Sequence, residues 1–244
     1  MSFPLPEWAR ATPSLAPERW RRRGLGPRLA ALAEAVAPET RVADVGTDHA
    51  LLPEALLAEQ HVRAAVGCDR APAPLAAARR RLEDPRRRGP AVELRQGEGL
   101  EPLSPGEFDV VVLAGFGGPR MLDLLSARWP ESIGVRTLVL QPTAGLPRLR
   151  AELSARGGRV REENIVREGD RGFVTSVVEL GHPPRALSPF EALRGWVSED
   201  EPLLRAWLES QLDHLTRSRR GDLAEEVRAW LYARTLDDST PQKR

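Results

Sequence analysis

The sequence is poor in cysteine and in long apolar segments. One cysteine, Cys68, occurs among 244 residues, so an internal disulfide and a metal centre built from cysteines are excluded, as is usual in a reducing compartment. No apolar run approaches the roughly 20 residues that a membrane helix needs. Prolines interrupt the segment 1–20, where a signal peptide would be apolar. We therefore expect a cytoplasmic protein without a membrane span, an export signal or a metal site.

Lysine is almost absent as well. The 36 basic residues include one lysine, Lys243, and the arginines cluster at 21–23, 79–81, 86–88 and 217–220. Guanidinium groups bind phosphates in a bidentate manner, so these clusters are compatible with RNA. Runs of charge more often lie on solvated surfaces, and the formal net charge is only +1. The clusters therefore leave RNA binding open without requiring it.

The length allows one α/β core with a small appendage. The start of the chain lacks periodicity, strand and helix patterns then alternate, and only helical patterns follow Pro183 and Pro184. We predict an irregular N-terminal arm over 1–27, a core domain over 28–183, a helical hairpin over 184–236 and a disordered tail over 237–244.

Apolar runs in the core domain predict a sheet. The continuous run 110–113 is typical of a strand that is buried on both faces of a parallel sheet. Helical spacing separates the first five strands, and the last two form an antiparallel pair around the turn 168–172. This order predicts an α/β, Rossmann-like fold with a mixed seven-stranded sheet. The strands are expected at 41–45, 64–67, 92–95, 108–114, 137–140, 160–166 and 173–180, and the helices at 27–37, 51–59, 75–82, 121–125 and 148–155.

Two helical stripes follow residue 184. Leu204, Trp207 and Leu208 belong to the first, and Val227 and Trp230 belong to the second. Each amphipathic helix must cover its apolar face, so the two are expected to form a hairpin with its bend near residue 221.

The turns after the strands carry the candidate site. In an open parallel sheet, ligands bind beyond the carboxyl ends of the strands. Glycines in such turns let the backbone approach a ligand, and carboxylates recognise cations or hydroxyl groups. The candidate residues lie at the strand ends and in the turns that follow them: Asp44, Gly46, Asp48 and His49 at the first strand, Asp69 at the second, Gly97, Glu98 and Gly99 at the third, and Ala114, Gly115, Phe116, Gly117 and Gly118 at the fourth.

Their pattern favours an adenosine-containing cofactor. Asp69 lies 25 residues after Asp44, near the spacing at which an acidic residue meets ribose hydroxyls in nucleotide-binding folds. The Gly-x-Gly-x-x-Gly turn of dinucleotide oxidoreductases is absent, and an acidic turn repels a pyrophosphate. It attracts the sulfonium and amino groups of S-adenosylmethionine. Taken alone, the Asp-x-Gly turn is equally compatible with a structural turn.

Four segments together resemble a known family. DVGTDHALLP (44–53), RQGEGL (95–100), LAGFGG (113–118) and LVLQP (138–142) are similar to the TrmK family of bacterial tRNA (adenine-N1)-methyltransferases. The resemblance extends from about residue 28 to 180. It implies a class I methyltransferase core over 28–183, a helical C-terminal domain, S-adenosylmethionine as cofactor and methylation of N1 of adenine 22 in tRNA.

The resemblance also implies roles for the cofactor-binding residues. Asp44, Gly46 and Asp48 would line the methionine end of the cofactor, Asp69 its ribose, and Glu98, where the family usually has aspartate, its adenine. The complete cofactor-binding set is Asp44, Gly46, Asp48, His49, Asp69, Gly97, Glu98, Gly99, Ala114 and Gly115.

The catalytic candidates are the glycine-rich segment 115–118 and His49. The segment would form the floor on which the target base meets the methyl group. Phe116 could stack on the base or fill the core. His49 could contact the substrate or carry a proton, although a histidine after a strand more often fixes a turn. Adenine N1 has an in-plane lone pair, so the attack needs no base and positioning supplies much of the catalysis.

Departures from the family lie on the substrate side. Leu51 replaces a tyrosine, Phe116 a methionine, and Phe173 occupies the position of an aromatic hydroxyl. A diverged methyltransferase with another substrate and a non-catalytic module that binds the cofactor therefore remain alternatives to tRNA methylation. The glycine floor disfavours the second alternative, because a binding module has no need to bring a base close to the sulfonium. The oligomeric state cannot be inferred from the sequence.

Overall fold

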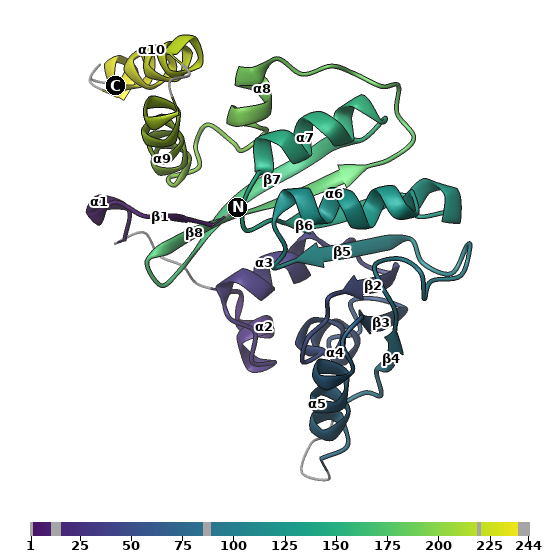
Figure 1. The fold of residues 1–244 in the computed structure, drawn as a ribbon. Coiled ribbons are helices and arrows are strands. Elements are labelled where there is room, and N and C mark those ends of the chain that lie inside the picture. Colours follow the sequence, from purple (N-terminus) through teal and green to yellow (C-terminus); the bar gives the residue numbers. More distant parts are fainter. Residues whose placement is uncertain (1, 11–15, 85–88, 219–220, 239–244) are drawn as a thin grey trace.

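A mixed β-sheet lies at the centre of the protein, between two layers of helices (Figure 1). The computed structural model describes residues 2–10, 16–84, 89–218 and 221–238. The strand order is β1-β8-β6-β5-β2-β3-β4, and β7 pairs with β8. The strands are β1 (Ser2–Pro4), β2 (Arg41–Val45), β3 (Ala64–Asp69), β4 (Glu93–Gln96), β5 (Val110–Ala114), β6 (Thr137–Gln141), β7 (Arg159–Glu168) and β8 (Arg171–Glu179).

The strands β2 to β6 are parallel, and β7 and β8 close the sheet in antiparallel fashion. Successive side chains of β5 point to opposite faces, so Val111 and Leu113 join one core cluster while Val110 and Val112 join the other. The continuous apolar run is thus buried on both faces, as predicted. The chain order reverses between β2 and β5, which is where ligands bind in such sheets.

One helix before the first parallel strand and four after the parallel strands cover the two faces. They are α3 (Pro27–Ala35), α4 (Leu51–Ala58), α5 (Pro72–Leu82), α6 (Gly118–Ala127) and α7 (Leu146–Ala155). Proline occupies the first turn of α3, α5, α6 and α7, where its missing N–H would be unpaired in any case. The apolar sides of α6 and α7 pack on one face of the sheet, and those of α3 and α4 pack on the other.

The N-terminal segment differs from the irregular arm that its composition predicts. β1 pairs antiparallel with β8, with Phe3 opposite Gly172, and so adds an eighth strand to the expected seven. Two short helices follow, α1 (Glu7–Arg10) and α2 (Glu18–Arg22). Trp20 of α2 is fully buried, and its indole N–H donates to the Glu34 carboxylate. A three-residue strand that is formed by pairing with a distant hairpin leaves no local pattern to detect.

The helical hairpin forms as predicted and has an additional helix before it. It consists of α9 (Leu204–Arg217) and α10 (Gly221–Asp238), which pack on each other beyond β1 (Figure 1). The unexpected helix is α8 (Pro189–Arg194), which Ser188 caps together with Glu191. Because α10 continues to Asp238, the disordered tail predicted from 237 begins too early, and its remainder, 239–244, lies outside the described residues. No described helix is long and apolar enough to cross a membrane.

Candidate functional site

A cavity of about 190 Å³ lies at the carboxyl ends of β2 and β5, beside α3. The structure brings six of the predicted cofactor-binding residues to its wall: Asp44, Gly46, Asp48, His49, Ala114 and Gly115. The other four lie outside this wall, at the ends of β3 and β4. The turn after β2 and the turn after β5 therefore form one site, as the rule for open parallel sheets requires.

Short hydrogen bonds hold the turn after β2. The amides of Gly46 and Thr47 donate to the carbonyl of Cys68 over 2.8 and 3.0 Å, which fastens the turn to the end of β3. The Thr47 hydroxyl donates to the Asp44 carboxylate over 2.7 Å. Burial raises the pKa of Asp44 to about 6, and the hydrogen bond from Thr47 only partly opposes this rise. Asp44 is thus a buried carboxylate whose charge a cationic ligand would stabilise.

The rest of the turn adopts an uncommon backbone. Asp48 and Ala50 have positive φ values of 51° and 55°, which residues other than glycine rarely adopt. Their side chains differ in accessibility, because Asp48 and His49 are exposed whereas Ala50 is buried. The His49 Nε2 lies 3.7 Å from a carboxylate oxygen of Asp48. His49 therefore lies at the open rim of the cavity, where it can contact a ligand or substrate from solvent.

The ends of β3 and β4 form a second, adjacent group. The Asp69 carboxylate accepts from the amide of Ala71 over 2.9 Å, and the amide of Gly97 donates to the carbonyl of Asp69 over 3.1 Å. The Glu98 carboxylate pairs with Arg120 of α6 and lies 3.7 Å from Arg70. Both carboxylates are thus at the edge predicted for the adenosine half of a cofactor, and Glu98 is held by two arginines that the sequence did not connect with it.

Three of the glycines outside the first cavity, Gly97, Gly99 and Gly118, have a steric or backbone reason for lacking a side chain. A Cβ at Gly97 would lie 2.9 Å from the Pro102 ring, and Gly99 has a φ of 54°. A Cβ at Gly118 would lie 2.7 Å from the carbonyl oxygen of Gly145, and the amide of Gly118 donates to Ala144. Gly117 precedes α6 as its N-cap.

Gly115 shares the positive φ of Gly99, with a value of 82°, but differs from the other glycines in its surroundings. It lines the cavity, and a Cβ on it would meet no atom within 4 Å. Of the predicted floor 115–118, Gly115 is thus the glycine that faces open space.

Phe116 lies directly against the turn after β2. A Cβ on Gly46 would be 2.4 Å from the Cζ of Phe116, so only glycine permits this contact. The ring is also half-buried against the core cluster that includes Leu113. Phe116 therefore packs in the core and contacts the turn after β2 at once, and its stacking on a base stays a prediction.

Arg28 and Gln141 complete the site, and sequence reasoning did not assign Arg28 to it. Arg28 lines the cavity, and its guanidinium donates to the Gln141 side chain over 3.4 Å and lies 3.6 Å from Glu168. Gln141 is buried and donates to the Arg28 carbonyl and to the Thr175 hydroxyl. The available signal was the position of Arg28 at the start of the family resemblance, directly after Pro27.

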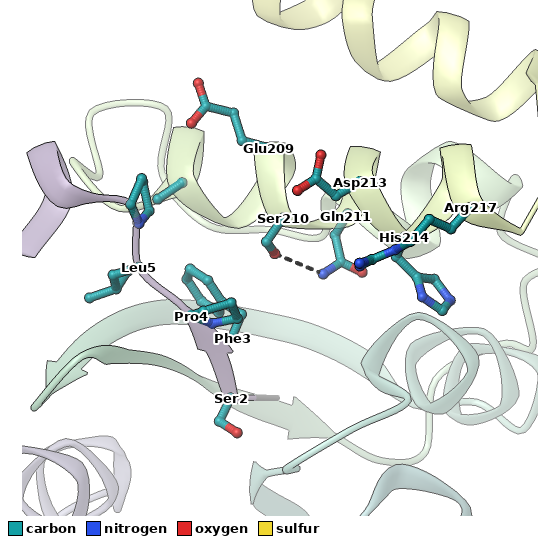
Figure 2. Close-up of a pocket in the computed structure, with 12 residues that line it drawn as sticks. Ser2, Phe3, Pro4, Leu5, Glu209, Ser210, Gln211, Asp213, His214 and Arg217 are labelled. Atoms are coloured by element: carbon teal, nitrogen blue, oxygen red, sulfur yellow. Dashed lines mark hydrogen bonds between the residues drawn. The ribbon is translucent and has the colours of Figure 1, made fainter.

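A second cavity of about 580 Å³ lies between β1 and α9 and contains none of the predicted site residues (Figure 2). Its charged side chains come from α9 and have both signs: Glu209, Asp213 and Arg217, with His214 beside them. The two carboxylates oppose the binding of a phosphate at this place. Arg219 and Arg220, two members of the arginine cluster 217–220, lie outside the described residues, so the structure does not test RNA binding by this cluster.

Metal ligands are not grouped in the described part of the chain. No three histidine, cysteine, aspartate or glutamate side chains among these residues are arranged to hold a metal ion. Cys68, the free cysteine, is buried in β3.

Comparisons with known proteins identify the family and the fold. The chain is 29% identical over 157 residues to the tRNA (adenine(22)-N(1))-methyltransferase of Bacillus subtilis (strain 168), a match that covers 64% of this chain and 66%, just under two thirds, of that relative. A Streptococcus agalactiae protein of the NADB-Rossmann superfamily has 25% identity and a TM-score of 0.74, covering 85% of this chain and 97% of that one.

TrmK of M. capricolum in complex with S-adenosyl-homocysteine has 21% identity and a TM-score of 0.67, with coverage of 85% and 95%. These structures confirm the predicted Rossmann-like fold. The family described as a methyltransferase domain matches residues 25–175, more than half of the chain. The chain therefore belongs to the methyltransferase-domain family.

Proposed function

We propose that this protein is a cytoplasmic, S-adenosylmethionine-dependent methyltransferase that methylates N1 of an adenine in tRNA, at position 22. One observation carries the cofactor assignment. The cavity between the ends of β2 and β5 combines the carboxylates of Asp44 and Asp48 with the guanidinium of Arg28 around two glycines, Gly46 and Gly115. This charge pattern complements a zwitterionic amino acid, which is the methionine end of the cofactor.

Each part of the cofactor then has a partner among the residues at the strand ends. Asp44 and Asp48 would bind the amino group, and Arg28, which Gln141 and Glu168 hold in place, would bind the carboxylate. Asp69 would accept from the ribose hydroxyls. Glu98, Gly97 and Gly99 follow β4, next to Asp69, and would surround the adenine.

The chain's contribution to the chemistry is positioning. S-adenosylmethionine, when bound, supplies an electrophilic methyl group. The N1 lone pair of adenine is available without prior deprotonation, so no residue has to remove a proton before the attack. Gly115 leaves open space at the cavity wall, where the target base can approach. The exposed His49 would contact the nucleotide at the rim and not act as an obligatory base.

The tRNA assignment is supported by the activity named for the Bacillus subtilis relative. Departures from the TrmK pattern bear on this assignment, because two of them lie close to the site. Leu51 lines the cavity, and Phe173 packs under the guanidinium of Arg28, 5.7 Å from its centre. If these changes alter substrate binding and leave cofactor binding intact, the protein would be a diverged methyltransferase that acts on another substrate.

The test is transfer of a labelled methyl group from S-adenosylmethionine to total tRNA, total protein and small metabolites in separate reactions. We expect label in tRNA, recovered as 1-methyladenine after nuclease digestion, and lost when adenine 22 of the tRNA is replaced. The variant Asp44→Asn is the matched negative control. Label in protein or metabolites but not in tRNA would replace the proposed substrate, and no binding of the cofactor would overturn the assignment as an enzyme.

A further inference from the structure

The residues of the turn 47–50 do not by themselves explain its backbone conformation. It lines the candidate cofactor cavity, yet it contains two left-handed residues, Asp48 and Ala50, that are not glycine. Such residues persist where surrounding contacts impose their conformation. Inside the turn, the amide of Ala50 donates to the carbonyl of Thr47 over 2.9 Å. The carbonyls of His49 and Ala50 accept hydrogen bonds from outside the turn, from a side chain of α5.

Arg81 of α5 supplies these outside contacts. Its Nε donates to the carbonyl of His49 over 2.9 Å, and its Nη2 donates to the carbonyl of Ala50 over 3.1 Å. Its Nη1 donates to the carboxylate of Glu54, in the first turn of α4, over 2.6 Å. One planar guanidinium therefore donates to two successive carbonyls of the turn and to a carboxylate of the helix that follows. The single ammonium group of lysine cannot reproduce this geometry.

The side chains of Arg81 and Glu54 are largely buried, which distinguishes their ion pair from a solvated surface contact. The side chain of Glu54 is only 9% exposed and that of Arg81 is 23% exposed. Burial lowers the pKa of Arg81, so the charge is held there at a cost in desolvation. Arg79 and Arg80, its neighbours in the same cluster, are exposed. Among the three arginines, Arg81 is the one that turns inward toward the cofactor turn.

We propose that Arg81 is a positioning residue for the cofactor, which holds the turn 47–50 so that Asp48 and His49 line the cavity. Its guanidinium contacts main-chain carbonyls, and the ligand contacts belong to the turn that it holds. This inference rests on the proposed function only where it names S-adenosylmethionine. The conclusion that Arg81 holds the turn 47–50 rests on its hydrogen bonds alone.

The experiment compares three variants of the full chain. Arg81→Met keeps the aliphatic stem and removes the fork, Arg81→Lys keeps the charge, and Arg80→Met is the matched control on the same helix. Binding of S-adenosyl-homocysteine is measured by titration calorimetry, and amide hydrogen exchange of residues 47–54 is measured without ligand. Steady-state rates with tRNA give kcat and the KM for S-adenosylmethionine.

We expect Arg81→Met to weaken binding by about tenfold or more, because it removes charge-assisted hydrogen bonds that hold the site. The KM should rise by a similar factor while kcat at saturating cofactor changes less than about twofold, since the reacting groups are untouched. Exchange should accelerate within 47–54 and not in β5. Arg81→Lys should recover part of the affinity, and Arg80→Met should match the wild type.

The outcomes separate the two proposals. Equal affinity and equal exchange in Arg81→Met and Arg80→Met would overturn the role of Arg81, whatever the wild type binds. Failure of the wild type to bind S-adenosyl-homocysteine would overturn the proposed function, and faster exchange confined to 47–54 in Arg81→Met would still support Arg81 as the anchor of the turn. If Arg81→Met does not fold, Arg81→Lys decides in the same two measurements.

Discussion

The strands around the candidate site and the N-terminal strand β1 owe their places in the sheet to different kinds of contact. Around β2, β3 and β5, partners are close in the sequence, as in the hydrogen bond between Thr47 and Asp44. At β1 they are far apart, as in the pairing of Phe3 with Gly172 of β8. The cofactor side is therefore built from segments with local patterns, which Arg28 and Arg81 reach from distant positions, whereas tertiary contacts alone place β1. A sequence pattern reports the first kind of structure and is nearly silent about the second.

The largest effect should come from the buried ion pair that joins α7 to β7. Arg150 and Glu163 have side-chain exposures of 1% and 0%, and Arg150 also donates to the carbonyls of Ala192 and Leu193 of α8. Arg150→Ala should reduce the free energy of unfolding by about 3–5 kcal/mol, because an uncompensated carboxylate stays buried. Urea denaturation measures this.

The exposed pair of Arg205 with Glu209 on α9 is the control. Arg205→Ala should cost about 0.5 kcal/mol or less, since exposed ion pairs contribute little. If Arg150→Ala and Arg205→Ala prove equally mild, α8 is not held to the core through Arg150.

The cofactor side should respond most strongly at Asp69. Asp69→Ala removes the proposed acceptor for two ribose hydroxyls and should weaken binding of S-adenosylmethionine by about 1.5–3 kcal/mol. Its carboxylate also accepts from the amide of Ala71 at the start of α5, so a loss of about 1 kcal/mol in folding stability should accompany the change. Calorimetric titration with a folded variant checks the first value. Unchanged affinity would reduce Asp69 to a residue that only stabilises the turn before α5.

Much of the cofactor side could be predicted from the sequence. β2 has the predicted bounds, and the turn residues Asp44, Gly46 and Asp48 line the cavity with Gly115. Glycine, acidic residues and buried strands leave local patterns, and strand ends of a parallel sheet meet at one edge. The cofactor roles assigned to these residues stay predictions.

The parts that the sequence could not predict depend on long-range contacts. Arg28 reaches Gln141 across 113 positions, and Arg81 reaches His49 across 32. β1 exists only through its pairing with β8. An arginine in a charge run looks the same whether it is solvated or buried against a turn, so the pattern at 79–81 could not single out Arg81.

The N-terminal strand offers a further test of the tertiary side. A Cβ on Gly172 would lie 2.3 Å from the ring of Phe3, so Gly172→Ala should displace β1. The expected cost is about 1–3 kcal/mol in unfolding free energy, as for other overpacked positions. Gly221→Ala is the control, because a Cβ there meets nothing within 4 Å. Cofactor affinity should be equal in both variants, and a loss of affinity in Gly172→Ala alone would mean that β1 supports the cofactor site.

The smallest and most specific effect concerns pH. Burial raises the pKa of Asp44 to about 6, and a cationic ligand binds best when this carboxylate is ionised. Affinity for S-adenosylmethionine should therefore fall as the pH drops through 6, to about one tenth at pH 5. Asp44→Asn should bind weakly and without this dependence. Asp48→Asn, whose native side chain is 67% exposed, should keep it.

The raised pKa of Asp44 has the opposite effect on folding stability: stability falls with rising pH, whereas cofactor affinity increases. Because the pKa of Asp44 is higher in the folded chain than the usual value near 4, its contribution to stability is complete below about pH 4 and is lost as the pH rises through 6. The unliganded wild type should therefore lose stability relative to Asp44→Asn over this range, while its cofactor affinity increases. Calorimetry of both chains between pH 4 and 8 measures how the free energy of unfolding and the cofactor affinity change with pH. Slopes of the same sign would show that Asp44 is not the group that couples folding to binding at this turn.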